Sequence, residues 1–151
     1  VRSSLSAGVI TYSDLVATTP FENTCDRAEI QGKYLREAFE HSVFGDRFIL
    51  QTSGVQVTFN MTQPDGQKIH SLKVLCRTCE VPRYENVEDE TWYRVVLNNF
   101  LLVNGDNFAM IRDNMRNHQV GEVDIDALTY YVEKHSPISF LHPRRRVRFI
   151  N

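Results

Sequence analysis

An aromatic side chain followed by a polar turn marks residues 99–108 as a candidate binding site. Phe100 follows a strand-like run, and the turn Asn-Gly-Asp at residues 104–106 precedes a predicted helix. This order places a flat apolar ring beside the Asp106 carboxylate and beside the unpaired backbone N–H groups of a helix start. A nucleoside requires such groups, because its base stacks on an aromatic ring and its sugar hydroxyls donate to an acceptor. A second ring, Phe21, could enclose the base from the other side.

The same residues also admit ordinary structural interpretations. Phe100 could be a core residue at the end of a strand, and Phe21, which follows Pro20, could pack locally within its loop. Asp106 could cap the helix that begins after it, a role that is compatible with a contact to ribose. Both interpretations therefore stay open for each of these three side chains.

The three cysteines indicate a small structural disulfide. Cys76 and Cys79 form a Cys-x-x-Cys pair at the end of a strand-like run. A thioredoxin-type redox pair would stand at a helix N-terminus, and a zinc site would need a second pair. We therefore predict a Cys76–Cys79 disulfide, which implies an oxidising compartment. Cys25 is either a buried free thiol or the partner of a cysteine outside this sequence.

One further feature fits a secreted protein. Asn60-Met61-Thr62 is an N-glycosylation sequon beside a predicted turn at Pro64. No apolar run approaches the ~20 residues of a membrane helix, and neither a signal peptide nor a lipid-anchor signal is recognisable. Because the formal net charge is only −2, we expect neither nucleic acid nor a membrane as a partner.

The elements that position these residues predict one α+β domain. The chain has 151 residues, and its apolar periodicity changes between that of helices and that of strands without a regular βαβ alternation. We therefore expect a mixed or antiparallel sheet flanked by helices. Predicted strands cover residues 25–30, 48–50, 55–60, 68–76, 92–97 and 146–150. Predicted helices cover residues 32–44, 107–117 and 124–135, with a shorter one after a cap at Ser13-Asp14, and residues 81–89 are a predicted loop.

Helix 32–44 is the clearest of these elements. Its apolar residues, among them Leu35 and Phe39, share one face, whereas Lys33 and Glu40 lie mostly on the other. The helix is therefore a core element, and we expect His41 to be a packing or surface histidine and not a ligand.

Four stretches together are similar to a known family. They are Pro20-Phe21; residues 30–43, with the pattern Gly-x-x-Leu-x-x-Ala-Phe-Glu-His-Ser; residues 75–82, around the Cys-x-x-Cys pair; and residues 99–108. In this order they resemble the C-terminal domain of the 5'-nucleotidase/apyrase family, secreted or surface metallophosphoesterases that remove phosphate from nucleotides. The resemblance covers nearly the whole chain, and the helix and the Phe100 loop are its specific parts. It implies the fold of that C-terminal domain.

The resemblance assigns roles to the candidate residues. Phe21 and Phe100 would hold a purine between them, and Asp106 would accept from the ribose hydroxyls. Arg2 matches the arginine of an Asn-Gly-Gly-x-Arg loop, which reaches the ribose and phosphate region in the family. Asn104 stands where the family often has glycine, and we include it among the binding residues. Since asparagine tolerates a left-handed backbone better than most residues, the turn can survive this change.

The chemistry of the family belongs to a different domain. A separate N-terminal domain holds two metal ions through Asp-x-His and Gly-Asn-His-(Asp/Glu) motifs, neither of which occurs in this sequence. The five histidines lie far apart, whereas two-metal chemistry needs clustered ligands. We therefore expect no catalytic residue, metal or cofactor in this chain, which alone should hydrolyse nothing. We expect the divalent metal pair in the missing N-terminal catalytic domain. That domain would also be a protein partner of this chain.

Two functional hypotheses follow. The first is a nucleotide-recognition domain of a secreted 5'-nucleotidase- or apyrase-type enzyme, with a purine nucleotide or nucleoside as ligand. The second is a non-enzymatic secreted effector, similar to the salivary relatives of blood-feeding arthropods. It would bind host proteins, or be bound by host antibodies, through the acidic residues 85–90 or the arginine-rich residues 144–148. A segment before Val1 that carries metal-ligand motifs would favour the enzyme.

Overall fold

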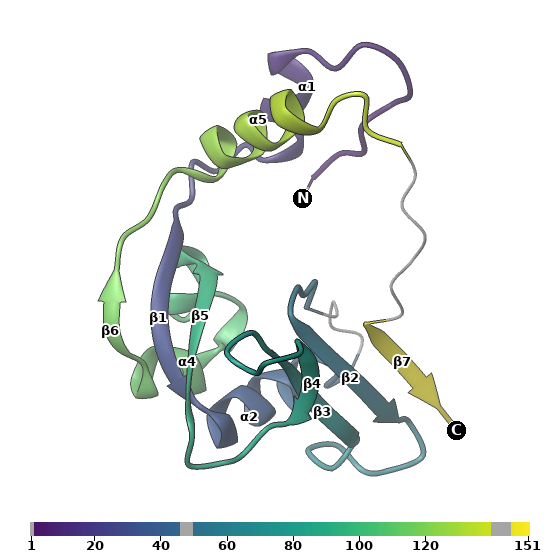
Figure 1. Cartoon of the computed structure of the whole chain (residues 1–151), viewed down its shortest axis with the longest axis vertical. Coiled ribbons are helices and arrows are strands. Elements are labelled where there is room, and N and C mark those ends of the chain that lie inside the picture. Colours follow the sequence, from purple (N-terminus) through teal and green to yellow (C-terminus); the bar gives the residue numbers. More distant parts are fainter. Residues whose placement is uncertain (1, 46–49, 140–145) are drawn as a thin grey trace.

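Three antiparallel strands form the first of the two sheets that the described residues make (Figure 1). The computed structural model describes residues 2–45, 50–139 and 146–151. The central strand β1 (Cys25–Gln31) pairs with β5 (Trp92–Asn98) on one side and with β6 (Arg116–Gln119) on the other. Its register places Cys25 opposite Asn98, so the first residue of β1 and the last residue of β5 lie at the same end of the sheet.

The second sheet has four strands in the order β4-β3-β2-β7. The hairpin of β2 (Val55–Asn60) and β3 (Ile69–Cys76) is closed by the predicted turn, in which Gln67 N–H donates to the Pro64 carbonyl at 3.1 Å. The strand β4 (Arg83–Asn86) covers one edge, and β7 (Val147–Ile150) pairs in parallel with β2 at the other. A disulfide joins Cys76 to Cys79 between β3 and β4.

The helix α2 (Gly32–Ser42) lies between the two sheets and contributes to both cores (Figure 1). Ala38 belongs to the apolar cluster beneath β1, whereas Phe39 packs with Val57 and Phe59 of the second sheet. Alternating apolar residues on β2 supply the sheet side of this second core, as their period of two requires. A single amphipathic helix thus holds the two sheets together.

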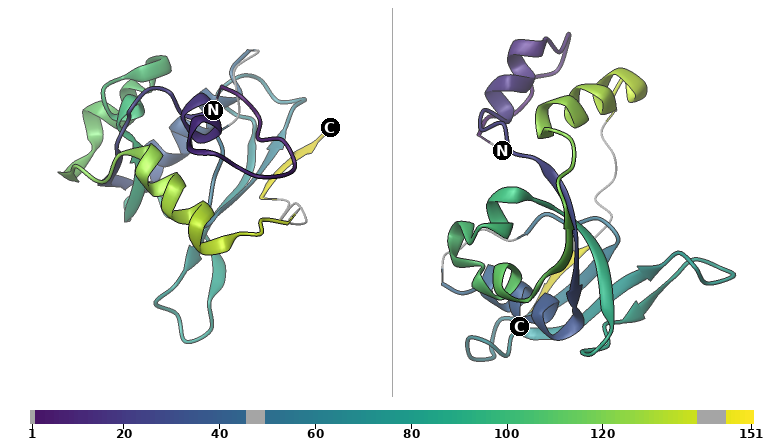
Figure 2. Two further views of the ribbon diagram at one scale, coloured as in Figure 1. Left: turned by 90° about the horizontal axis from the view of Figure 1, so that it is seen from above. Right: turned by 90° about the vertical axis from the view of Figure 1, so that its left-hand side faces the viewer.

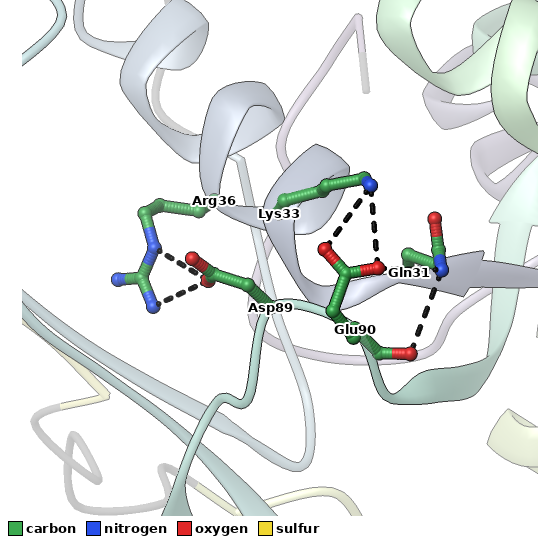
Figure 3. A network of polar contacts seen from close by, with 5 residues as sticks. All are labelled: Gln31, Lys33, Arg36, Asp89 and Glu90. Carbon is green, nitrogen blue, oxygen red and sulfur yellow. Dashed lines mark hydrogen bonds and ion pairs between the residues drawn. The ribbon is translucent and has the colours of Figure 1, made fainter.

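A polar network fixes the start of α2 to the loop before β5 (Figure 3). The backbone N–H groups of Gly32 and Lys33 donate to Thr91 and Asp89 carbonyls, each at 3.0 Å. Lys33 also pairs with Glu90 at 3.2 Å, and Arg36 pairs with Asp89 at 3.1 Å. Two acidic side chains of segment 85–90 therefore already have cationic partners on α2.

The helices α1 (Tyr12–Thr18) and α5 (Asp124–His135) form a separate small layer at one end of the molecule (Figures 1 and 2). Leu15, Ile125 and Val132 are its buried core. In the part of the chain that the structure describes, no helix combines the length and the apolar character needed to cross a bilayer.

Several predicted boundaries are wrong. The predicted helix 107–117 is shorter, since α4 covers only Ala109–Asn114 and the extended backbone of Met115, with φ −78° and ψ 155°, ends the helix. Residues 116–119 instead form β6, because they pair with β1. Within the predicted loop 81–89, residues 83–86 form β4, because the edge of β3 pairs with them.

The predicted cap of the first helix also differs from the observed one. Thr11, and not Ser13-Asp14, caps α1, with Asp14 completing a capping box from inside the helix. Val123 is the N-cap of α5, which makes Asp124 its first residue. Of the predicted strand 48–50, residues 48 and 49 lie outside the described residues, and Leu50 belongs to no strand. The predicted α+β class, with mixed and antiparallel sheets, is confirmed.

Candidate functional site

The Phe100 ring lies on a short helix at the end of β5. The helix α3 (Asn99–Leu102) begins where the Asn98 side chain accepts a hydrogen bond from Phe100 N–H at 2.9 Å. Leu102 is buried in the first core, whereas the Phe100 side chain remains 45% exposed. Phe100 is therefore not a core residue, and its ring offers surface to a ligand.

Gly105 supports this ring directly. A Cβ added at Gly105 would lie 2.4 Å from two carbon atoms of the Phe100 ring and 2.4 Å from the Phe100 carbonyl oxygen. Only glycine leaves enough space for such an approach. The ring thus rests against the backbone of the turn that follows it, which limits its rotation.

We expect Gly105→Ala to displace the Phe100 ring and to lower the free energy of unfolding by about 1–3 kcal/mol through overpacking. Loss of the ring position should also weaken nucleotide binding. Urea denaturation and ligand titration measure the two effects. Gly66→Ala is the control for binding, because Gly66 has a φ of 82°, so its substitution strains the backbone and lowers stability without placing a Cβ within 4 Å of any atom. Equal binding by both variants would contradict the role given to Gly105.

The turn that follows α3 has a left-handed backbone at three of its residues. The 3-10 turn η1 (Gly105–Asn107) follows Asn104, whose φ is 76°, and Asp106 and Asn107 have φ values of 51° and 63°. Asparagine and aspartate are the side chains that adopt this region most readily. The alternative that Asp106 caps the next helix is wrong, because α4 follows Phe108 and has no side-chain cap.

His41 of α2 contacts this turn from the protein side. Its Nε2 lies 2.9 Å from the Asp106 carbonyl oxygen, and its ring meets the buried Phe108 ring edge-on at 4.7 Å. The predicted packing role of His41 is thus observed. The hydrogen bond to the Asp106 backbone was not foreseen, because the two residues are 65 positions apart and no local pattern links them.

Phe21 and Arg2 lie together near the end of the first sheet at which β1 begins. Phe21 is 56% exposed, and the Arg2 guanidinium lies 4.9 Å from the centre of its ring. Thr24 accepts a hydrogen bond from Asn99 N–H at 2.9 Å, and three residues of chain span at most about 10 Å. The segments that carry Phe21 and Phe100 therefore end beside one another.

A buried carboxylate fixes the neighbouring end of β1. Asp26 is only 2% exposed and accepts from His118 Nε2 at 2.6 Å and from Gly121 N–H at 3.1 Å. Burial alone raises the pKa of Asp26, but hydrogen bonds from Thr24, His118 and Gly121 outweigh it and lower the pKa from 3.8. No local sequence pattern predicts this pair, because the partners are 92 positions apart.

Cys25 is a free thiol beside this carboxylate. Burial raises its pKa, and the negative charges of Asp124, Asp26 and Glu122 add to the effect. Because the thiolate is the reactive form, Cys25 is a poor nucleophile.

Possible metal ligands come together at one place among the described residues, where Cys76, Cys79 and Glu85 lie within 4.8 Å of one another. The two cysteines are joined in the disulfide and have no thiolate to offer. These residues therefore do not fit a two-metal hydrolytic centre, and we derive no catalytic step from them.

Comparison with known proteins identifies the family of this chain. The profile of the 5'-nucleotidase C-terminal domain family matches residues 1–113. The chain therefore belongs to the 5'-nucleotidase family, as its C-terminal domain. It is 41% identical to apyrase from Tabanus yao over an alignment of 157 positions, which covers 99% of this chain and 28% of that protein. It is 40% identical to the snake venom 5'-nucleotidase of Naja atra over 131 residues, covering 84% and 25%.

A solved structure agrees with this assignment. The 5'-nucleotidase precursor from Thermus thermophilus superposes with a TM-score of 0.88 at 26% identity, covering 99% of this chain and 30% of that one. The fold is thus that of a 5'-nucleotidase C-terminal domain. The chain spans less than a third of each of these relatives.

Proposed function

We propose that this chain is the nucleotide-recognition domain of a secreted 5'-nucleotidase- or apyrase-type phosphohydrolase. The observation that carries the proposal is the exposed Phe100 ring, which rests on Gly105 within a segment of the family match. A purine would stack between Phe100 and Phe21. Base–aromatic stacking contributes about 1–3 kcal/mol per base, which makes these rings the main source of affinity.

The polar residues would orient the rest of the ligand. Asp106 would accept hydrogen bonds from the ribose hydroxyls, and Asn104 would shape the turn beside it. Arg2 would reach the ribose and phosphate region from its position over Phe21. A divalent metal pair in the N-terminal domain would supply the hydrolytic chemistry, so this chain would contribute orientation and no catalytic residue.

Titration of the chain with AMP, followed by NMR, tests the proposal. We expect shifts of the backbone amides around Phe21, Phe100 and Asp106, with a dissociation constant on the order of high micromolar to millimolar. Ribose 5-phosphate is the control ligand, because it lacks the base and should bind more weakly. Unchanged spectra at millimolar AMP would count against the proposal.

We also propose that Asn60 carries an N-linked glycan in the secreted protein. The Asn60 side-chain oxygen accepts from Thr62 N–H at 3.0 Å and from Thr62 Oγ1 at 2.7 Å, and residues 61–67 are exposed. Chain secreted from insect cells should lose one glycan on treatment with an N-glycosidase. Asn60→Gln should abolish that shift. Secreted wild-type chain of unmodified mass would be the opposite result.

The alternative, a secreted effector that binds host proteins or antibodies, has no observation of its own to favour it. Asp89 and Glu90 of the acidic segment pair with α2, and residues 144 and 145 of the arginine-rich segment lie outside the described residues. The AMP titration separates the hypotheses, because an effector that kept only the fold has no need to bind a purine.

A further inference from the structure

The turn after Phe100 has a backbone conformation that costs free energy in every residue except glycine, although asparagine and aspartate tolerate it best. Asn104, Asp106 and Asn107 all have positive φ values, between 51° and 76°. Side chains in this region persist only where the surrounding structure holds them. The turn therefore depends on contacts from other elements of the fold.

One such contact comes from the C-terminal end of α2. The His41 side chain lies 2.9 Å from the Asp106 carbonyl oxygen through Nε2, and its ring packs edge-on against Phe108 at an interplanar angle of 78°. A carbonyl oxygen only accepts hydrogen bonds, so Nε2 is the protonated, donating nitrogen. His41 thus combines two contacts of different chemistry, a directional hydrogen bond and an apolar ring contact.

The end of α2 is itself firmly held. The carboxylate of Glu40, next to His41, is nearly buried and accepts from the backbone N–H groups of Lys68 at 3.0 Å and Ile69 at 2.6 Å. Ser42, on the other side, donates to the Phe39 carbonyl at 2.7 Å. Since its neighbours are tied to the second sheet and to the helix, His41 is a fixed point for the turn.

We propose that His41 is a positioning residue of the nucleotide site. Its Nε2–H holds the Asp106 peptide group, and this orients the Asp106 carboxylate and the turn on which Phe100 rests. The inference deepens the proposed function and rests on it. His41 itself touches the backbone of the turn and is assigned no contact with the ligand.

Two substitutions separate the hydrogen bond from the ring contact. His41→Phe keeps an aromatic ring against Phe108 but has no donor, so its urea midpoint should stay close to that of the wild type. Its affinity for AMP should fall by about 5- to 10-fold, the equivalent of one hydrogen bond. His41→Gln places an amide donor near the Nε2 position and should restore affinity to within about threefold of the wild type.

The first readout is the affinity of each full chain for AMP. A His41→Phe chain that is folded and binds AMP as tightly as the wild type overturns the proposal. If His41→Phe does not fold, His41→Asn replaces it, because its shorter amide cannot reach the Asp106 carbonyl. Equal affinities of the Asn and Gln variants would then be the overturning result.

The second readout needs no ligand. Without AMP, the amide resonances of residues 104–108 should move in His41→Phe and return toward their wild-type positions in His41→Gln. Unmoved resonances overturn the positioning role whether or not AMP binds. Failure of the wild-type chain to bind AMP, with the resonances moving as expected, contradicts the proposed function alone and leaves His41 as the residue that sets the turn.

Discussion

Phe100→Ala should weaken the binding of AMP to this chain by about 5- to 100-fold, the equivalent of losing one base–aromatic stack. The ring is 45% exposed and the neighbouring Leu102 supplies the buried apolar contact of α3, so the variant should fold normally. Isothermal titration with AMP measures the loss, and urea denaturation checks the fold.

Phe149→Ala provides a matched control for this prediction. Phe149 is 47% exposed on β7 and stacks on Phe59 of the second sheet, away from the Phe100 turn. Its removal should lower stability and leave AMP binding unchanged. If both variants bind AMP equally well, Phe100 is not the platform for the base.

Asp26→Ala should lower the free energy of unfolding by about 1–3 kcal/mol, because it removes a buried acceptor and leaves its donors without a partner. The carboxylate is 2% exposed, and its loss leaves His118 Nε2 and Gly121 N–H without their acceptor. Urea denaturation at neutral pH measures the change. Asp113→Asn serves as the control, because Asp113 is exposed and forms a surface ion pair with its neighbour Arg112, so its midpoint should hardly move.

The pH dependence of stability tests the same carboxylate. The pKa of Asp26 is lower in the folded chain than its ordinary value of 3.8, so the folded state favours the ionised form. Its contribution is therefore complete above about pH 4–5 and is lost as the pH falls below 4 toward the folded pKa. The urea midpoint of the wild type should drop more steeply from pH 5 to pH 3 than that of Asp26→Asn. Parallel profiles would contradict this assignment.

Local sequence patterns predicted the elements that carry their own periodicity. The alternation of Val55, Val57 and Phe59 predicted β2, and the apolar face of residues 32–44 predicted α2. The short strands β4 and β6 were missed because their residues are polar, and they are strands only because the edges of β3 and β1 pair with them. Such pairing is a property of the assembled sheets and leaves no local pattern.

The candidate site was predictable in outline. The order of Phe100, Gly105 and Asp106 located the turn, and the structure adds that Gly105 lies against the ring. The contact of His41 with Asp106 and the burial of Glu40 could not be read from helix periodicity, which placed Glu40 mostly on the polar face. Both depend on chain segments that meet only after folding.

The most direct test of the central claim is a measurement of intermolecular NOEs between AMP and the chain carrying ¹³C-labelled phenylalanine. A purine held between the two rings predicts NOEs from the adenine H2 and H8 protons to both Phe21 and Phe100. NOEs to neither ring, with AMP demonstrably bound, would place the base elsewhere and contradict the account.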